Sequence, residues 1–230
     1  MPKHLQRELD RLKKRILSLG ALAEQNVRTA VLALERRDAD RAEQVIAADP
    51  EIDQAEVETE EECLKVLALH QPVAIDLRFI VAVLKINNDL ERIGDLAVNI
   101  AERALYLATH EARTFTFDFQ GMADKTQQML KKSLDALVNM DAAAAREVCR
   151  ADDEVDAYNR DMYIQVQEAI REDVGQLRGL IHLLSASRHL ERIADHTTNI
   201  AEDVIYMVEG EIIRHRAEDY REEAGGEDAR

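Results

Sequence analysis

Residues 89–102 read DLERIGDLAVNIAE, and residues 189–202 read HLERIADHTTNIAE. Nine of these fourteen positions are identical at an offset of 100 residues. Upstream, the likeness continues at an offset of 103 residues, where DDEVD at 152–156 aligns with DPEID at 49–53 and SLDAL at 133–137 aligns with AVLAL at 30–34. An internal repeat indicates a structural unit that occurs twice, so the chain is predicted to contain two similar units of about 100 residues each.

The repeated segment has the pattern of a helix with one apolar face. In the first copy, apolar residues recur at three- and four-residue steps, namely Leu90, Ile93, Ala97, Ile100, Ala104 and Leu107. The 230 residues include only 3 prolines and 8 glycines, a composition that favours helices. Helices joined by short turns must bury their apolar stripes against one another. We therefore predict an all-α protein of two tandem, pseudo-twofold-related three-helix bundles with six long helices.

Capping residues and proline predict where these helices begin and end. Asp38 or Asp40, Asp141 and Asp173 are suited to cap helix N-termini, and Pro72 suits the start of a helix. These signals place helices at about residues 4–36, 40–69, 73–109, 121–139, 142–171 and 174–213. The first bundle then covers residues 1–110, a linker covers 111–120, and the second bundle covers 121–213. We expect the charged, glycine-containing tail at 214–230 to be disordered.

The charge of the chain excludes some partners and permits others. A formal net charge of −16 argues against nucleic-acid binding, which depends on basic contacts to phosphates, and against docking on anionic lipid by charge alone. The N-terminal residues lack the apolar stretch of a signal peptide, and the longest apolar run, Phe79 to Leu84, is too short to cross a membrane. Cys63 and Cys149 lie at non-equivalent repeat positions, so we expect buried thiols in a reducing cytoplasm.

Carboxylates recur on one side of the repeated helices, roughly opposite the apolar stripe. In each copy, a glutamate and an aspartate four residues apart are followed on that side by an asparagine and another glutamate. These residues are Glu91, Asp95, Asn99 and Glu102 in the first copy, and Glu191, Asp195, Asn199 and Glu202 in the second. The preceding helix adds Asp49, Asp53, Glu56 and Glu60, of which the second copy keeps only the equivalents Asp152 and Asp156. Like charges at this spacing destabilise an isolated helix by about a few tenths of a kcal/mol, so the repeated arrangement calls for a compensating cation.

Hairpin geometry predicts that the acidic rows of neighbouring helices meet. Asp53 lies 19 residues before Pro72 and Glu91 lies 19 after it, while Asp49 and Asp95 are each 23 residues away. Residues equidistant from the turn of a helical hairpin lie at the same level. Four carboxylates in one patch suit hard cations, and iron, manganese, zinc and magnesium are all candidates. The predicted ligands are Asp49, Asp53, Glu91 and Asp95 in the first copy and Asp152, Asp156, Glu191 and Asp195 in the second, with Asn99, Glu102, Asn199 and Glu202 around them.

The acidic pattern does not by itself require a metal site. Acidic residues opposite an apolar stripe are commonly the solvated face of a helix, and duplicated sequences resemble each other wherever they have not drifted. No catalytic residue is predicted, because the chain lacks a G-x-x-x-x-G-K-[ST] loop, a G-x-S-x-G elbow and Glu-x-x-His pairs. Metal-assisted hydrolysis and a purely structural dimer module remain as alternatives. We expect His189 and His196, which align with Asp89 and Leu96, to be solvated.

Both copies resemble the PhoU family of bacterial phosphate-uptake regulators. Each copy carries an L-E-R-I-[GA]-D-x-x-x-N-I-A-E segment and an upstream D-x-x-[IV]-D, and the resemblance covers residues 4 to about 215. The resemblance implies metal clusters on the eight carboxylates predicted as ligands. It also implies a non-enzymatic regulator that restrains phosphate uptake and phosphate-starvation genes. The second copy departs from the first in lacking counterparts of Glu56 and Glu60, which implies a smaller or weaker cluster there.

Partners and location are also implied by the resemblance. Members of the family associate with the ATPase subunit of the phosphate ABC transporter and with a phosphate-sensing histidine kinase, at the cytoplasmic side of the membrane. We therefore expect a cytoplasmic homodimer that is peripheral to the membrane through these partners and does not insert into it. The alternative within the same fold is an accessory protein of another phosphate or metal transporter.

Overall fold

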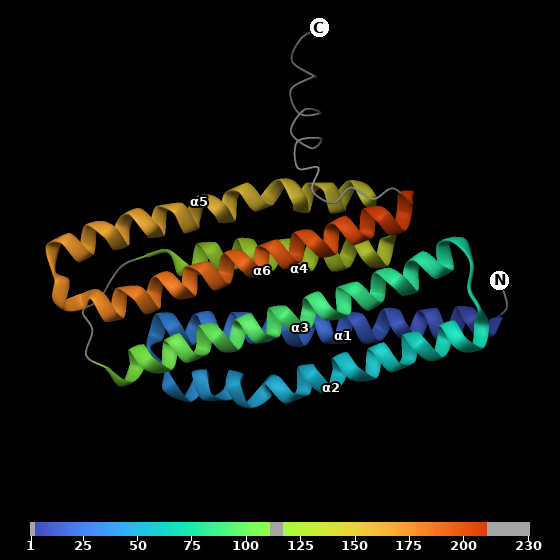
Figure 1. Cartoon of the computed structure of the whole chain (residues 1–230), viewed down its shortest axis with the longest axis horizontal. Coiled ribbons are helices and arrows are strands. Elements are labelled where there is room, and N and C mark those ends of the chain that lie inside the picture. Colours follow the sequence, from blue (N-terminus) through green and yellow to red (C-terminus); the bar gives the residue numbers. More distant parts are fainter. Residues whose placement is uncertain (1–2, 111–116, 211–230) are drawn as a thin grey trace, which may run out of the picture.

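Six long helices follow one another in the residues that the structure describes (Figure 1). The computed structural model describes residues 3–110 and 117–210. The helices are α1 (Lys3–Arg36), α2 (Ala39–His70), α3 (Ala74–Thr109), α4 (Phe119–Asn139), α5 (Ala142–Glu172) and α6 (Leu177–Glu209), with a short 3-10 turn, η1 (Val174–Gln176), before α6. Within those two ranges the chain forms no strand, so the prediction of an all-α protein is confirmed.

Two helix ends differ by a few residues from the approximate predicted bounds, for local reasons. The linker was expected to reach residue 120, but α4 begins at Phe119, because the Asp118 carboxylate accepts a hydrogen bond from the Gly121 amide (2.7 Å). The sixth helix was expected to reach residue 213, but Gly210 adopts a left-handed φ of +81° and ends α6 at Glu209. The remainder of the predicted linker (residues 111–116) and the predicted disordered tail (214–230) lie outside the described residues.

Side-chain caps begin several helices where the sequence places them. Asp38 and Asp141 each accept a hydrogen bond at 3.0 Å from the amide three residues later, at Arg41 and Ala144. Asp173 caps η1 by accepting from the Gly175 amide (2.9 Å). Each cap satisfies one of the amides that a helix N-terminus leaves unpaired, and such a cap contributes about 1 kcal/mol. The caps at Asp38 and Asp141 begin α2 and α5 directly after the preceding helices. The α1–α2 and α4–α5 connections are therefore short, and consecutive helices fold back on each other.

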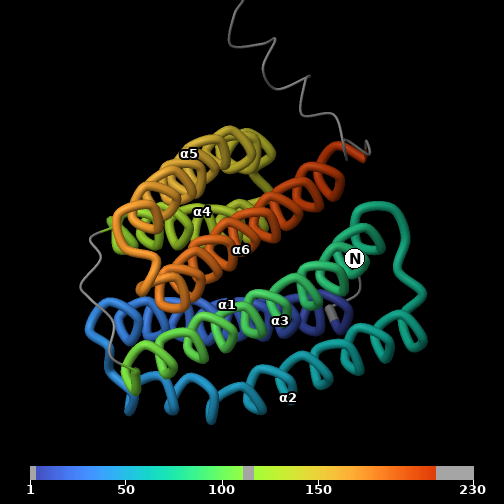
Figure 2. The backbone as a smooth tube through the Cα atoms, turned by 60° about the vertical axis from the view of Figure 1, so that its left-hand side comes forward, coloured from blue at the N-terminus to red at the C-terminus, as the bar shows by residue number. Residues whose placement is uncertain are grey.

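The two copies of the repeat form two three-helix bundles that share one apolar core. Helices α1–α3 pack together in one bundle and α4–α6 in the other. The bundles meet where α3 lies antiparallel to α6 and where α1 packs on α4 (Figures 1 and 2). The largest fully buried side chains come from both bundles and are Leu12, Ile16, Leu19, Ile52, Ile80, Ile86, Leu90, Ile93, Ile100, Met122, Leu130 and Leu137. Burial of each such side chain contributes about 1.5–3 kcal/mol.

Polar side chains cross the seam between α3 and α6. The Lys85 ammonium donates to Asp203 (2.9 Å), whose side chain is only 2% exposed. His196 pairs with Asp89 at 2.8 Å, so the expectation that His196 would be solvated is wrong. This pair depends on how the two bundles face each other, which periodicity within one helix does not encode.

His189, which was also expected to be solvated, is half-buried at the same seam. Its Nε2 atom lies 3.2 Å from the Ser185 hydroxyl. Burial, together with the nearby charges of Arg103, Arg192 and Arg188, lowers the pKa of His189 to about 4. The imidazole is therefore neutral at pH 7.

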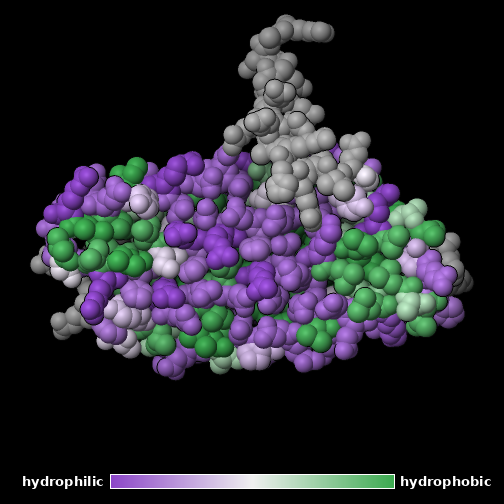
Figure 3. All heavy atoms as spheres, viewed as in Figure 1, coloured by the Kyte–Doolittle hydropathy of each residue, from purple (hydrophilic) through white to green (hydrophobic). Residues whose placement is uncertain are grey.

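Apolar side chains are exposed at the turns of both helical hairpins. They include Leu69, Val73, Ile75 and Leu77 at the α2–α3 turn and Val174, Leu177 and Ile181 at the α5–α6 turn. The two turns lie at opposite ends of the molecule in Figure 1, and apolar surface gathers near both ends in Figure 3. No helix in the described ranges is long and apolar enough to cross a membrane. Exposed apolar patches of this kind commonly mark sites of protein contact.

A difference between the copies is explained by packing between α2 and α3. A Cβ atom at Gly94 would lie 3.0 Å from Cδ1 and 3.1 Å from Cγ2 of Ile52, which is fully buried. The equivalent positions in the second copy carry Ala194 and the smaller Val155, both also buried. Glycine therefore avoids two tight contacts with the isoleucine, and valine, which has no Cδ1 atom, removes the shorter of the two.

We predict that Gly94→Ala destabilises the protein by about 1 kcal/mol in the native background. Overpacking of about 1–3 kcal/mol outweighs the gain in helix propensity of about 1 kcal/mol. In an Ile52→Val background, the same change should cost less, because the contact with Cδ1 is absent. Urea unfolding of all four variants, followed by helical circular dichroism, measures the coupling. An equal effect of Gly94→Ala in both backgrounds would contradict the explanation.

Candidate functional site

The α2–α3 hairpin brings four predicted carboxylates together as the first acidic cluster, which consists of Asp49, Asp53, Glu91 and Asp95. Burial raises the pKa of Asp49, and the nearby charges of Asp53 and Asp95 raise it further. Burial also raises the pKa of Glu91, to which Asp95 and Asp53 contribute. Charges shift each other's pKa in this way only when they are close. The level pairs expected from the hairpin, Asp49 with Asp95 and Asp53 with Glu91, therefore do interact.

Part of the charge of this cluster is balanced by a neighbouring arginine. Arg92 lies 3.0 Å from Asp95 Oδ2 and 3.4 Å from Glu91 Oε2. The longer of these contacts is not a hydrogen bond, and both Glu91 Oε2 and Asp49 Oδ1 are buried without a hydrogen-bond partner. A buried, unsatisfied polar atom costs about 1–3 kcal/mol, and more when it is charged. The first acidic cluster thus holds two buried oxygens that a cation could satisfy.

Glu56 joins the first acidic cluster, although it was not among the predicted ligands. Its charge raises the pKa of Glu91, and its own pKa is raised by burial and by Glu60. The buried Asn87 donates to the Glu56 carbonyl oxygen (2.9 Å) and to its Oε1 atom (3.0 Å). The sequence signal for Glu56 is its place in the acidic row of α2, three residues after Asp53.

The α5–α6 hairpin forms the second acidic cluster, which consists of Asp152, Asp156, Glu191 and Asp195. Burial raises the pKa of Asp152 to about 7, and the charges of Asp195, Asp156, Asp153 and Glu191 contribute. Burial, Asp195 and Asp156 likewise raise the pKa of Glu191. The structure therefore brings together all four residues predicted for this copy, by the same hairpin geometry.

Asn159 replaces Glu56 in the second copy and keeps its link to the next helix. The Ser187 hydroxyl donates to Asn159 Oδ1 at 2.9 Å, in place of the contact between Asn87 and Glu56. The amide side chain keeps this hydrogen bond but brings no charge. The second acidic cluster accordingly lacks the fifth carboxylate of the first.

The four residues predicted around the ligands have separate surroundings. Asn99 donates to the Asp95 carbonyl oxygen (2.9 Å), and Glu102 pairs with Arg103 (3.3 Å). Asn199 reaches across the seam to Asp89 (3.5 Å), and Glu202 lies near Cys149, whose pKa its charge helps to raise. A role for these residues at the acidic clusters stays a prediction.

The chemistry of both clusters suits a hard cation better than a soft one. Every candidate ligand is a carboxylate oxygen, the donor that magnesium, manganese and iron prefer. As the side chains lie, no three or more His, Cys, Asp or Glu residues in the described ranges converge as a ready-made metal site. Binding therefore requires rotation of the carboxylates toward a common point and displacement of the Arg92 contact.

The two cysteines are not among the residues predicted as metal ligands. Both are free, Cys63 being buried and Cys149 half-buried. Burial raises the pKa of each thiol to about 12. Both thiols are therefore protonated at neutral pH in the metal-free protein.

Comparison with known families identifies the repeat. The family model described as "PhoU domain" matches residues 16–104 and again residues 119–204. Each match contains four of the eight clustered carboxylates. The chain belongs to the PhoU family. The two PhoU domains coincide with the two three-helix bundles, and each domain carries one acidic cluster.

Named relatives and solved structures agree with this assignment. A "Phosphate-specific transport system accessory protein PhoU" from Serratia marcescens is 34% identical over 212 residues, which cover 92% of this chain and 87% of the relative. The crystal structure of PhoU from Pseudomonas aeruginosa has a TM-score of 0.86 at 36% identity, covering 90% of this chain and 99% of that one. The phosphate transport system regulatory protein PhoU from Streptococcus pneumoniae has a TM-score of 0.83 at 31% identity, with 90% and 98% covered.

The second acidic cluster should make the stability of the metal-free protein depend on pH. A carboxyl group whose pKa is raised by folding contributes stability that is fully present below its ordinary pKa of 3.8 and is lost as the pH rises through about 7. We predict that Asp152→Asn, which cannot ionise, gains stability relative to the native protein as the pH rises from about 4 to about 8, by up to about 4 kcal/mol and by less where solvent screens the charge. Urea unfolding in the presence of EDTA measures this difference.

The exposed Asp135→Asn change on α4 is the matched control, because it removes the same charge outside the cluster. Its effect on stability should be nearly the same at both ends of this pH range. A stability difference between Asp152→Asn and the native protein that does not change with pH would contradict the prediction.

Proposed function

We propose that this chain is a regulatory accessory protein of a phosphate-specific transport system that restrains phosphate uptake and the phosphate-starvation response. The observation that carries the proposal is the match of both bundles to the PhoU domain, together with a relative named as a phosphate-specific transport system accessory protein that aligns with 92% of the chain. The chain acts through binding rather than catalysis in this proposal. The candidate functional residues that occur in both copies are carboxylates, and all of them are proposed as metal ligands. In the described ranges, no residue among them is assigned as a nucleophile or as a separate general base.

Metal binding at the two acidic clusters is the second part of the proposal. Asp49, Asp53, Glu91 and Asp95 hold one site, assisted by Glu56, and the four carboxylates of the second acidic cluster hold the other. The supporting observations are the mutually raised pKa values and the buried oxygens of Asp49 and Glu91 that lack hydrogen bonds. A bound cation neutralises each cluster and so allows a partner segment to approach a surface that otherwise repels acidic groups.

The proposed partners are the ATPase subunit of the phosphate ABC transporter and a phosphate-sensing histidine kinase. Contacts with these proteins place the chain at the cytoplasmic face of the membrane without insertion into it. The exposed apolar side chains at both hairpin turns are suited to such contacts and to formation of a homodimer. Because the turns are equivalent in the repeat, each copy offers one such surface.

Deletion of the gene should raise phosphate uptake and the activity of a phosphate-starvation reporter in phosphate-rich medium. Reintroduced native protein should restore both, and a pull-down should recover the transporter ATPase. The double change Glu91→Gln/Asp95→Asn should restore regulation only in part if metal binding is required. Unchanged phosphate uptake after deletion, with altered uptake of a different ion, would instead identify an accessory protein of another transporter.

Metal binding is measured directly by isothermal titration of the EDTA-treated protein with Mn²⁺, Fe³⁺, Zn²⁺ and Mg²⁺. We predict that Glu91→Gln/Asp95→Asn weakens binding at the first acidic cluster by roughly tenfold or more, because two charged ligands are lost. The control is Glu43→Gln/Glu168→Gln, which removes two exposed carboxylates outside both clusters. Equal binding by both double variants and the native protein would end the metal proposal.

A further inference from the structure

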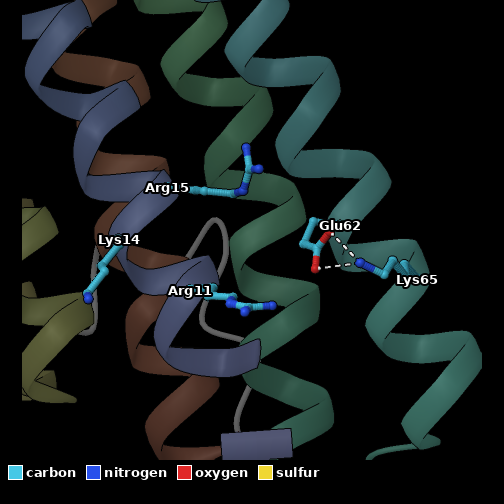
Figure 4. Close-up of a pocket in the computed structure, with 5 residues that line it drawn as sticks. All are labelled: Arg11, Lys14, Arg15, Glu62 and Lys65. Carbon is cyan, nitrogen blue, oxygen red and sulfur yellow. Dashed lines mark hydrogen bonds and ion pairs between the residues drawn. The ribbon is translucent and has the colours of Figure 1, made fainter. Parts of the chain in front are cut away.

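We infer that a cleft between α1 and α2 is a binding site for a nucleotide-sized ligand that carries phosphate groups. The cleft has a volume of about 420 Å³ and is lined by Arg11, Lys14, Arg15, Glu62 and Lys65. Figure 4 shows Arg11 and Arg15 extending from α1 toward α2, where Glu62 and Lys65 lie. Lys14 extends from α1 in another direction in this view. Two guanidinium groups and an ammonium group therefore surround the opening, with one carboxylate among them.

The arginines of the cleft belong to a row along one face of α1. Arg7, Arg11 and Arg15 follow at four-residue steps, which places them above one another on the helix surface. Like charges at this spacing destabilise a helix, as in the acidic clusters. The row is also a local excess of positive charge in a chain whose formal net charge is −16. An anion bound beside the row would offset this repulsion.

The ion pairs that these cations already make are weak enough to be exchanged. Arg11 pairs with Glu8 (3.0 Å), Arg15 with Glu58 (3.1 Å) and Lys65 with Glu62 (3.1 Å). The three cationic side chains are 65%, 41% and 56% exposed. Exposed pairs of this kind contribute about 0–1 kcal/mol. Guanidinium groups bind phosphate oxygens through two parallel hydrogen bonds and gain more than from these pairs.

The second copy of the repeat does not reproduce the basic lining of the cleft. At the repeat offset of 103 residues, Lys14, Arg15 and Lys65 align with Phe117, Asp118 and Glu168. Phe117 and Asp118 precede α4, so the second copy has no helix at the positions of Lys14 and Arg15. The acidic clusters, in contrast, recur in both copies. The basic lining thus belongs to the first copy of the repeat, and it is separate from the residues proposed to bind metal.

A second cavity next to the cleft indicates which chemical group the ligand carries besides phosphate. A second cavity of about 260 Å³ shares Lys14 and Arg15 with the cleft and continues along α1 and α2 to Leu22, Ala55 and Thr59. A ligand with phosphates beside Arg11 and Arg15 would place a less polar group over these side chains. A nucleoside di- or triphosphate has this division between a charged and a flat, weakly polar end, and its size suits the combined space.

Binding of ATP and of pyrophosphate to the full chain is tested by isothermal titration in the presence of EDTA, so that metal sites do not take part. The native protein should bind both, and ATP more tightly. Arg11→Gln/Arg15→Gln should weaken ATP binding by about tenfold or more, since it removes two charge-assisted contacts. Arg11→Lys/Arg15→Lys should weaken it less, because it keeps the charge and loses only the paired hydrogen bonds.

The matched control is Arg150→Gln/Arg171→Gln, which removes two exposed arginines from α5 in the other bundle. This variant should bind ATP as the native protein does. We expect all variants to fold, because the changed residues are exposed. Thermal melting followed by circular dichroism checks this. A parallel titration with phosphatidylglycerol vesicles tests whether the cleft binds lipid phosphate instead. Three results would overturn the inference: no ATP binding by the native protein, equal weakening of ATP binding in the control, or binding to the vesicles alone. The metal titrations are independent, so either proposal can fail without the other.

Discussion

The antiparallel packing of α3 on α6 is the constraint on which the rest of the structure depends. These two helices carry the repeated motif, and each faces its counterpart with one side and its own hairpin partner with another. The apolar stripe of α3 is committed to the core through Leu90, Ile93 and Ile100. The carboxylates of the same helix are thereby directed toward α2, where a second acidic row lies. The same argument applies to α6 and α5, so one packing arrangement generates both acidic clusters.

Pseudo-symmetry also explains why the copies differ at the seam. A twofold axis between α3 and α6 would bring each residue of one helix against the equivalent surface of the other. Identical charges would then face each other twice, which is unfavourable in a buried setting. The chain instead pairs Asp89 with His196, whose repeat equivalents are His189 and the apolar Leu96. Lys85 and Asp203 form a second link whose repeat equivalents, Ser185 and Arg103, lack the complementary charges. At these seam positions the two copies therefore carry different side chains.

Local sequence predicted most of the fold and the composition of the acidic clusters. Periodicity, caps at Asp38 and Asp141, and the distance of each carboxylate from Pro72 are all properties of one hairpin, so a single copy contains the information. The sequence did not predict the seam contacts of His189 and His196, because these depend on the pairing of distant helices. Glu56 was predicted in the acidic row but not among the ligands, for a different reason. Its position in the cluster depends on Asn87, a buried polar residue on a face otherwise read as apolar core.

The two copies share the acidic clusters but differ in the basic lining of the cleft between α1 and α2. Carboxylates at equivalent hairpin levels survive in both bundles although they raise each other's pKa, and in the first bundle they leave buried oxygens without hydrogen bonds. Residues that only solvate a helix face have no reason to retain that unfavourable arrangement, because a neutral polar side chain would serve as well. The basic lining of the cleft between α1 and α2, in contrast, is encoded in the first copy and not in the second. Duplication therefore supplied a scaffold with two equivalent acidic surfaces, and later divergence made the two bundles unequal in the charges that they present to other molecules.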